Sequence, residues 1–157
     1  MVKPIKITVG IFILILSIFV IVISFLTITE YKPAKETVLA VLPASVPLNI
    51  DRISVLTWNI GYAGLSDDTD FFYEGGKLTR TSESRTSTNL AGIGKILAES
   101  DADVIMIQEI DTDSRRSYRT DQTSVLSQML PDYCIYFGCD FYAPFVPLPL
   151  NDPTGKV

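Results

Sequence analysis

The longest run of hydrophobic positions lies near the amino terminus. Residues 7–28 form an uncharged run, ITVGIFILILSIFVIVISFLTI, which only a few Thr, Ser and Gly residues interrupt. A helix of this length covers the hydrocarbon core of a bilayer, because each residue adds about 1.5 Å along the helix axis. The pattern predicts a transmembrane helix at 7–28, preceded by a short basic tail at 1–6.

A cleaved signal peptide is the competing interpretation of this run. Signal peptides have hydrophobic regions of about 7–15 residues that end at a small-residue cleavage site. This run is longer, and no such site follows it directly. Lys3 and Lys6 precede the run and Lys32 and Lys35 follow it, so the charges that orient a membrane helix are nearly balanced. We expect a single-pass anchor in the cell membrane, with the rest of the chain extracytoplasmic.

The chain after the anchor is expected to divide into a linker and a domain. Residues 29–49 contain Pro33, Pro43 and Pro47, which disfavour a continuous helix and predict a linker. The remaining residues, 50–157, have the composition of a soluble domain, although a short one.

The domain begins with patterns typical of a parallel α/β unit. Residues 52–60 (RISVLTWNI) and 103–107 (DVIMI) are rich in β-branched and apolar types, so we predict two strands, the second of them buried. Residues 66–87 are polar and predict a surface loop. At 88–100, apolar side chains at helical spacing predict a helix, which Ser87 or Thr88 can cap. Strand, loop, helix and strand together predict a βαβ unit with parallel strands.

The sequence of the rest of the domain predicts one more helix and one more strand. Residues 122–130 (QTSVLSQML) precede Pro131 and favour a helix, and the aromatic-rich residues 133–141 favour a strand. Cys134 and Cys139 are the two cysteines, and they can form a small disulfide loop or remain two thiols.

Charge and composition narrow the possible functions. From Asn49 onward, acidic residues outnumber basic ones by 16 to 9. This stretch lacks the cluster of Lys and Arg that strong duplex binding requires. The chain has no histidine, the residue that most hydrolases use as acid or base near neutral pH. No segment indicates a protein partner.

Polar side chains follow both predicted strands where each strand ends. Asn59 ends the first strand, and Gln108 and Glu109 end the second. Ligands of parallel sheets bind beyond these ends, so we expect Asn59 and Glu109 to face one crevice. Carboxylate and amide oxygens suit Mg²⁺. The alternatives are that Asn59 only forms a turn and that Glu109 is only a solvated strand end.

Two longer segments surround these strand ends: ISVLTWNIGYAGL contains Asn59, and ADVIMIQEID contains Glu109. Together they resemble the opening motifs of the endonuclease/exonuclease/phosphatase family. The resemblance implies an α/β fold that forms part of a four-layer sandwich of mixed β-sheets flanked by helices, here preceded by the transmembrane helix. It also implies that Glu109 and Asn59 are catalytic residues that hold Mg²⁺ or Mn²⁺, and that Asp111, Arg116 and Tyr118 contact substrate.

The expected protein is a membrane-anchored, metal-dependent hydrolase of phosphate esters, either a phosphodiesterase or phosphatase or a nuclease. Its substrate is then a phospholipid head group, a nucleotide or a nucleic acid, and its other partner is the bilayer around residues 7–28. Later motifs of the family contain histidines and an Asp-x-Asn pair, which this chain lacks, so we expect a truncated and inactive fragment. The alternative is a small membrane protein with a non-catalytic binding module.

Overall fold

The computed structural model describes residues 2–36 and 51–157. The chain divides into two compact units, Met1–Lys32 and Pro33–Val157. Most of the predicted linker, residues 37–49, lies outside the described residues, and so does residue 50 of the predicted domain.

The first unit is dominated by helix α1, Val2–Ile28. Its segment Lys6–Ile28 has a mean hydropathy of 3.2 and is long and apolar enough to cross a membrane. None of its side chains is buried within the structure. The hydroxyl groups of Thr27 and Thr29 donate to the carbonyl oxygens of Ile23 and Phe25, at 2.9 and 2.8 Å, so carbonyl groups of the helix satisfy them.

The second unit contains the βαβ arrangement that the sequence predicts. Its main elements are β1 (Val55–Asn59), α2 (Glu83–Glu99), β2 (Val104–Gln108) and α3 (Gln122–Met129). The two strands pair in parallel, with Val55 opposite Val104 and Asn59 opposite Gln108. Three short 3-10 helices lie in the loops: η1 (Gly61–Ala63), η2 (Phe72–Glu74) and η3 (Arg115–Ser117).

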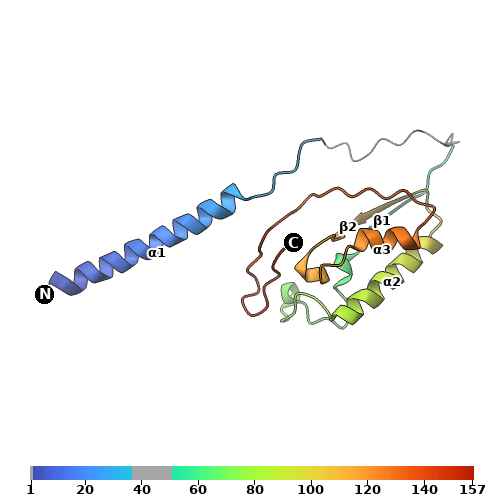
Figure 1. Ribbon diagram of the computed structural model, residues 1–157. Helices are drawn as coiled ribbons and strands as arrows, with labels where there is room; N and C mark the ends of the chain where they lie inside the picture. The colour runs from blue at the N-terminus through green and yellow to red at the C-terminus, as the bar shows by residue number, and fades with distance from the viewer. Residues whose placement is uncertain (1, 37–50) are drawn as a thin grey trace. The chain divides into compact units, whose positions relative to one another are not determined.

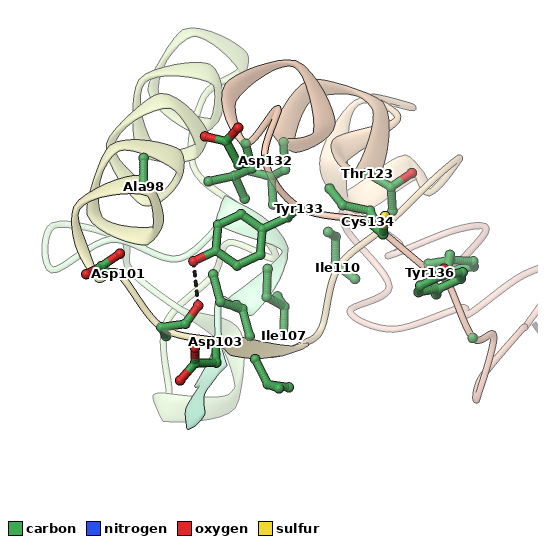
Figure 2. Close-up of a pocket in the computed structure, with 18 residues that line it drawn as sticks. Ala98, Asp101, Asp103, Ile107, Ile110, Thr123, Asp132, Tyr133, Cys134 and Tyr136 are labelled. Atoms are coloured by element: carbon green, nitrogen blue, oxygen red, sulfur yellow. Dashed lines mark hydrogen bonds between the residues drawn. The ribbon is translucent and has the colours of Figure 1, made fainter. Parts of the chain in front are cut away.

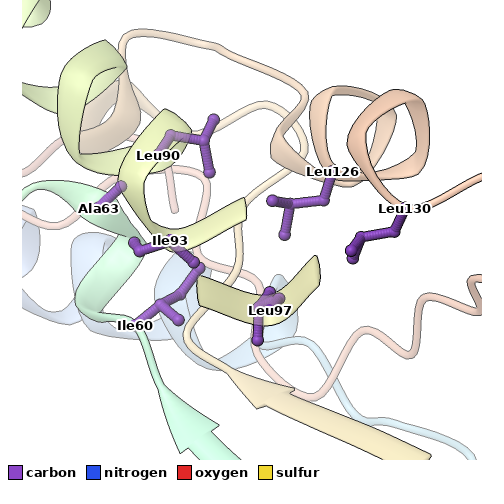
Figure 3. Packing of buried hydrophobic residues seen from close by; sticks show 7 residues of the cluster. All are labelled: Ile60, Ala63, Leu90, Ile93, Leu97, Leu126 and Leu130. Carbon is purple, nitrogen blue, oxygen red and sulfur yellow. The ribbon is translucent and has the colours of Figure 1, made fainter. Parts of the chain in front are cut away.

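Helices α2 and α3 pack against one face of the sheet (Figure 1). Leu90, Ile93 and Leu97 repeat at helical spacing and place one face of α2 in the core. Leu126 and Leu130 come from α3 and its end, and Figure 3 shows these side chains converging with those of α2. The core therefore forms where the pattern of apolar positions predicts it.

The other face of the sheet is open in the described residues. Exposed and half-buried positions alternate along both strands. Val55, Val104 and Met106 are exposed, and Met106 keeps 51% of its surface accessible. The prediction that the second strand is buried is therefore wrong, because the helices cover only the face that carries Ile105 and Ile107.

One predicted boundary and one predicted strand in the domain are also wrong. Helix α2 begins at Glu83, because the Ser82 hydroxyl caps it by accepting from the Arg85 N–H at 3.3 Å, so the preceding loop is shorter than predicted. No strand forms in residues 133–141. Their aromatic composition suits a strand, but no neighbouring strand provides hydrogen bonds for the backbone.

The carboxyl-terminal residues fold back on themselves. Ala143 and Val157 exchange two backbone hydrogen bonds, at 2.9 and 3.0 Å, and Val146 and Gly155 form an antiparallel bridge. The Arg115 side chain binds the Asp152 carboxylate at 2.9 Å, which attaches this hairpin to η3.

Candidate functional site

Asn59 and Glu109 lie in direct contact at the carboxyl ends of the two paired strands. The Asn59 Nδ2 donates to Glu109 Oε1 at 3.0 Å. The Asn59 Oδ1 accepts from the Gly61 N–H at 2.9 Å, which fixes the orientation of the amide. Both side chains are exposed to solvent. The structure thus brings the two residues together in the way that parallel strands of matched length require.

The backbone turns sharply where each strand ends. Glu109 has a left-handed φ of 53°, and Gly61, Tyr62 and Ala63 of η1 have φ values of 51°, 46° and 52°. Such a conformation costs a non-glycine residue about 1–2 kcal/mol. Two backbone bonds help to offset it, since the Ile60 N–H donates to Gln108 O at 3.0 Å and the Tyr62 N–H donates to Glu109 O at 2.7 Å. Left-handed residues of this kind concentrate at functional sites.

A buried polar network lies next to this pair. The Arg116 guanidinium binds the Asp111 carboxylate through two hydrogen bonds, both 3.0 Å long, and lies 4.2 Å from the centre of the Tyr62 ring. Asp111 is only 7% exposed. Two of the three predicted substrate contacts, Asp111 and Arg116, are therefore bound to each other.

Gln122 connects this network to the turn that follows β1. Its side chain is fully buried; Nε2 donates to Tyr62 O at 2.7 Å, and Oε1 accepts from the Asp111 N–H at 3.0 Å. The Gln122 N–H in turn donates to Asp111 O at 3.0 Å. These bonds join the start of α3 to both strand ends.

Tyr118, the third predicted substrate contact, has a different set of partners. Its hydroxyl donates to Thr81 O at 2.7 Å, and the Arg80 guanidinium lies 4.0 Å from the centre of its ring. Its proton is thus engaged by the backbone of the loop before α2. The structure does not bring Tyr118 into hydrogen-bond contact with Glu109 or Asn59.

Tyr62 is the titratable group whose pKa responds most clearly to the site. Burial raises the pKa of its phenol to about 12, and the nearby Arg116 lowers it, whereas the carboxylates of Glu109 and Asp111 raise it. The phenol is 4% exposed and donates to Thr79 O at 2.8 Å. Folding therefore favours the neutral phenol.

This shift predicts a loss of stability at high pH. Because the folded pKa of Tyr62 exceeds the usual value of 10.0, its stabilising contribution is complete below pH 10 and disappears as the pH rises toward 12. Tyrosinate absorbance is measured against pH for the unmodified chain and for Tyr62→Phe. The two chains should have the same number of tyrosines that ionise near pH 10. If Tyr62→Phe does remove a group that ionises near pH 10, the phenol is not buried as described.

The fit of these residues to a divalent cation is partial. Among the described residues, no three His, Cys, Asp or Glu side chains group as a metal site. Glu109 provides one carboxylate, and no donor within the described residues contacts its Oε2. Mg²⁺ binds through one or two carboxylates and keeps several waters, so this donor set suits Mg²⁺ or Mn²⁺ better than a cation that needs a full protein cage.

Sequence reasoning missed two residues of this region, Tyr62 and Gln122. Tyr62 follows Asn59 in the first motif, but nothing in its sequence position shows that its ring is buried under Arg116. Gln122 looks like an ordinary first residue of an amphipathic helix. A buried glutamine becomes recognisable only when its partners, 60 residues away in the case of Tyr62, are known.

Comparisons of the chain with protein-family models, with curated proteins and with solved structures found no match.

Proposed function

We propose that residues 51–157 carry the metal-holding part of a metal-dependent phosphoric ester hydrolase site. The observation that supports this most directly is the 3.0 Å hydrogen bond between Asn59 Nδ2 and Glu109 Oε1 at the ends of two parallel strands. Strand ends of this kind commonly bind ligands in open α/β sheets.

In this proposal Glu109 is the metal ligand and Asn59 is its positioning residue. The Asn59 amide holds one carboxylate oxygen, and the second oxygen is available to Mg²⁺ or Mn²⁺. The Asn59 Oδ1 already accepts one hydrogen bond, from Gly61, so its share in metal binding is the smaller one. When bound, the cation would polarise a phosphoryl oxygen and neutralise charge that develops there.

The proposed substrate is a phosphate ester, namely a phospholipid head group, a nucleotide or a nucleic acid. Arg116, whose guanidinium lies over the Tyr62 ring, is the cation proposed to face a phosphate. Its pairing with Asp111 fixes the guanidinium over Tyr62, so any contact with phosphate would use the N–H groups that Asp111 leaves unoccupied. Tyr118 would contribute through its ring and its hydroxyl oxygen, because its proton is donated to Thr81.

The proposal extends to the fold and to the membrane. We infer that the two-stranded sheet belongs to a four-layer sandwich, and the exposed apolar side chains of Val55, Val104 and Met106 on its open face support this. We also infer that α1 anchors the chain in the cell membrane with the domain outside the cytoplasm. The length and hydropathy of Lys6–Ile28 support the anchor.

Metal binding by the full chain in lipid nanodiscs tests the proposal. Titration with Mn²⁺, followed by the loss of its free electron-paramagnetic signal, should show one site that Glu109→Gln abolishes. Asn59→Ala should weaken the affinity about tenfold, as loss of a residue that orients a metal ligand usually does. Glu99→Gln is the matched control, because Glu99 is an exposed glutamate that pairs with Lys95 on the same helix.

The same samples should bind metal without hydrolysing bis(4-nitrophenyl) phosphate in Mg²⁺. The chain has no histidine, the residue that most often takes a proton from an attacking water near neutral pH. Turnover that disappears in Glu109→Gln would contradict the expected inactivity while supporting the hydrolase site. Mn²⁺ binding that is unaffected by Glu109→Gln would exclude the proposed metal ligand.

A non-catalytic binding module in a small membrane protein is the second candidate. It is favoured by the contacts of Asp111, Arg116 and Tyr118, all of which are satisfied within the chain. In that case Mn²⁺ would not bind at Glu109, and no variant would show turnover.

A further inference from the structure

The carboxyl-terminal hairpin ends in a tight turn that exposes leucine side chains. Residues 148–154, here called the hairpin tip, belong to the dark red end of the chain in Figure 1. Thr154 closes the tip by donating twice to Leu148 O, from its N–H at 3.0 Å and from its hydroxyl at 2.7 Å. A further backbone hydrogen bond of 3.2 Å closes a turn whose second residue is Leu150. Leu150 keeps 83% of its surface accessible, and Leu148 keeps 50%.

The fold of the domain does not explain a leucine in this turn. Turns favour Gly, Pro, Asn, Asp and Ser, because these residues suit the backbone geometry or bond to it. Leucine does neither, and this one is too exposed to gain much from packing. The turn is nevertheless held in place. Val146 and Gly155 exchange two backbone hydrogen bonds, at 2.7 and 3.0 Å, and Arg115 binds the Asp152 carboxylate at 2.9 Å.

More apolar side chains are exposed along the chain that leads to the tip. Tyr133 is still attached to the domain, because its hydroxyl donates to Ala102 O at 2.5 Å. Figure 2 shows Tyr136 well apart from Tyr133, and Tyr136 is exposed to solvent. Single exposed apolar residues are common, but a group of them marks an interaction surface. The exposed large apolar side chains of residues 141–150 are Phe141, Tyr142, Phe145, Leu148 and Leu150.

Charge does not oppose contact between the hairpin and a lipid surface. Residues 143–157 contain two charged side chains, Asp152 and Lys156. Asp152 pairs with Arg115, and Lys156 pairs with Asp113. The side chains of the hairpin therefore have no net charge, and they lack the cluster of Lys and Arg that attracts anionic lipids. This composition fits a zwitterionic bilayer, which is bound through apolar contact.

The proposed membrane anchor brings such a bilayer within reach. The segment Lys6–Ile28 is long and apolar enough to span it. Residues 29–50 connect that segment to the domain, and a chain of this length spans at most about 80 Å. Covalent attachment makes a contact between the domain and the bilayer intramolecular, so a few apolar side chains are enough for it. A fluid bilayer accepts a protruding turn, whereas a protein partner would need a hollow of matching shape.

We propose that the hairpin tip docks on the bilayer that α1 spans, with Leu148 and Leu150 inserted at the boundary between headgroups and acyl chains. This inference rests on the proposed anchor. Apolar side chains that enter this boundary bind more strongly as more of their surface is buried there. The exposed tyrosine and phenylalanine rings before the tip suit the same boundary, because aromatic side chains are enriched at membrane–water interfaces. The contact limits the motion of the domain relative to the membrane.

Quenching of a fluorescent label by lipid tests this contact in the full chain. Cys134→Ser and Cys139→Ser remove the native thiols, and Leu150→Cys carries a nitrobenzoxadiazole label in phosphatidylcholine nanodiscs. Phosphatidylcholine with a nitroxide on its acyl chain should remove most of the emission of this label. Tyr73→Cys is the matched control, because Tyr73 is a large side chain that is 77% exposed in η2, another loop of the same unit. Its label should keep its emission.

A charged variant tests whether the tip itself makes the contact. Leu148→Asp in the chain labelled at Leu150 should abolish the quenching, because a carboxylate is costly to insert among lipid chains. The hydrogen bonds from Thr154 reach the backbone oxygen of Leu148, so the variant keeps the groups that close the turn. An unchanged far-ultraviolet circular dichroism spectrum checks the fold. Quenching that survives Leu148→Asp, or equal quenching of the Leu150 and Tyr73 labels, would overturn the proposal.

A label in α1 separates failure of the docking from failure of the anchor. Leu16→Cys places the label inside the proposed span, where it should be quenched. Quenching at Leu16 without quenching at Leu150 would refute the docking and leave the anchor intact. Absence of quenching at both positions would refute the anchor as well. Blue-shifted emission at Leu150 that lipid does not quench would mean that protein, such as a second copy of the chain, covers the tip in place of lipid.

Discussion

Replacing Arg116 with methionine is expected to lower the free energy of unfolding of the domain by about 3–5 kcal/mol, because it leaves a buried carboxylate without its charged partner. Asp111 is 7% exposed and receives two hydrogen bonds of 3.0 Å from this guanidinium. The variant also removes the cation that lies over the Tyr62 ring. Urea unfolding of the full chain, followed by fluorescence of Trp58, the single tryptophan, measures the change.

Two matched variants separate the buried pair from a general effect of losing an arginine. Arg119→Met removes an exposed guanidinium from its pair with Asp113 and should cost less than about 1 kcal/mol. Combining Arg116→Met with Asp111→Leu should recover much of the lost stability, because no charge is then left buried. A small effect of Arg116→Met alone would mean that Arg116 is free of Asp111 and available to a ligand.

Leu97→Ala is expected to destabilise the domain by about 3–4 kcal/mol, through lost burial and the cavity that remains. Leu97 is fully buried, at the centre of the cluster that α2 and α3 form over the sheet (Figure 3). The same urea titration should show a lower midpoint with an unchanged slope, since the folded state loses packing and not compactness.

The neighbouring residue provides the control. Ile96 is 52% exposed and lies about 100° around α2 from Leu97. Ile96→Ala should change stability by less than about 0.5 kcal/mol, because alanine is also a better helix former. Equal effects of the two alanine variants would show that α2 does not present Leu97 to the core.

The parts of the fold that could be predicted are those in which neighbouring residues repeat a strong pattern. Leu90, Ile93 and Leu97 predict the buried face of α2 because a helix places every third or fourth residue on one side. The meeting of Asn59 and Glu109 could be predicted for a related reason. Two parallel strands linked by one helix carry their ends to the same edge of the sheet.

The beginning of α2 could not be predicted from local signals. Ser82, Ser84, Ser87 and Thr88 are all able to cap a helix, so the sequence offers several equivalent starting points. In the structure, Asn89 donates to Ala63 O and Ser66 Oγ, at 3.0 and 2.8 Å. These contacts with the preceding loop favour the longer helix.

The buried polar network could not be predicted because it depends on contacts between distant parts of the chain. Gln122 donates to Tyr62 O, and only the packing of α3 against η1 makes this possible. Residues 133–141 illustrate the opposite error. Their composition favours a strand, but a strand forms only beside a partner, and residues 133–141 pair with no strand in the part of the chain that the structure describes.

The parallel pairing of the two strands also determines when the sheet can form during synthesis. Ser54 binds Asp103, 49 residues later in the chain, and closing a loop of this length requires chain entropy to be lost first. At the usual rate of translation, β1 leaves the ribosome about 2–10 s before β2. Leu56 and Trp58 then have no sheet partner during that interval, so a nascent chain halted before Val104 should be a good substrate for chaperones that recognise exposed apolar segments.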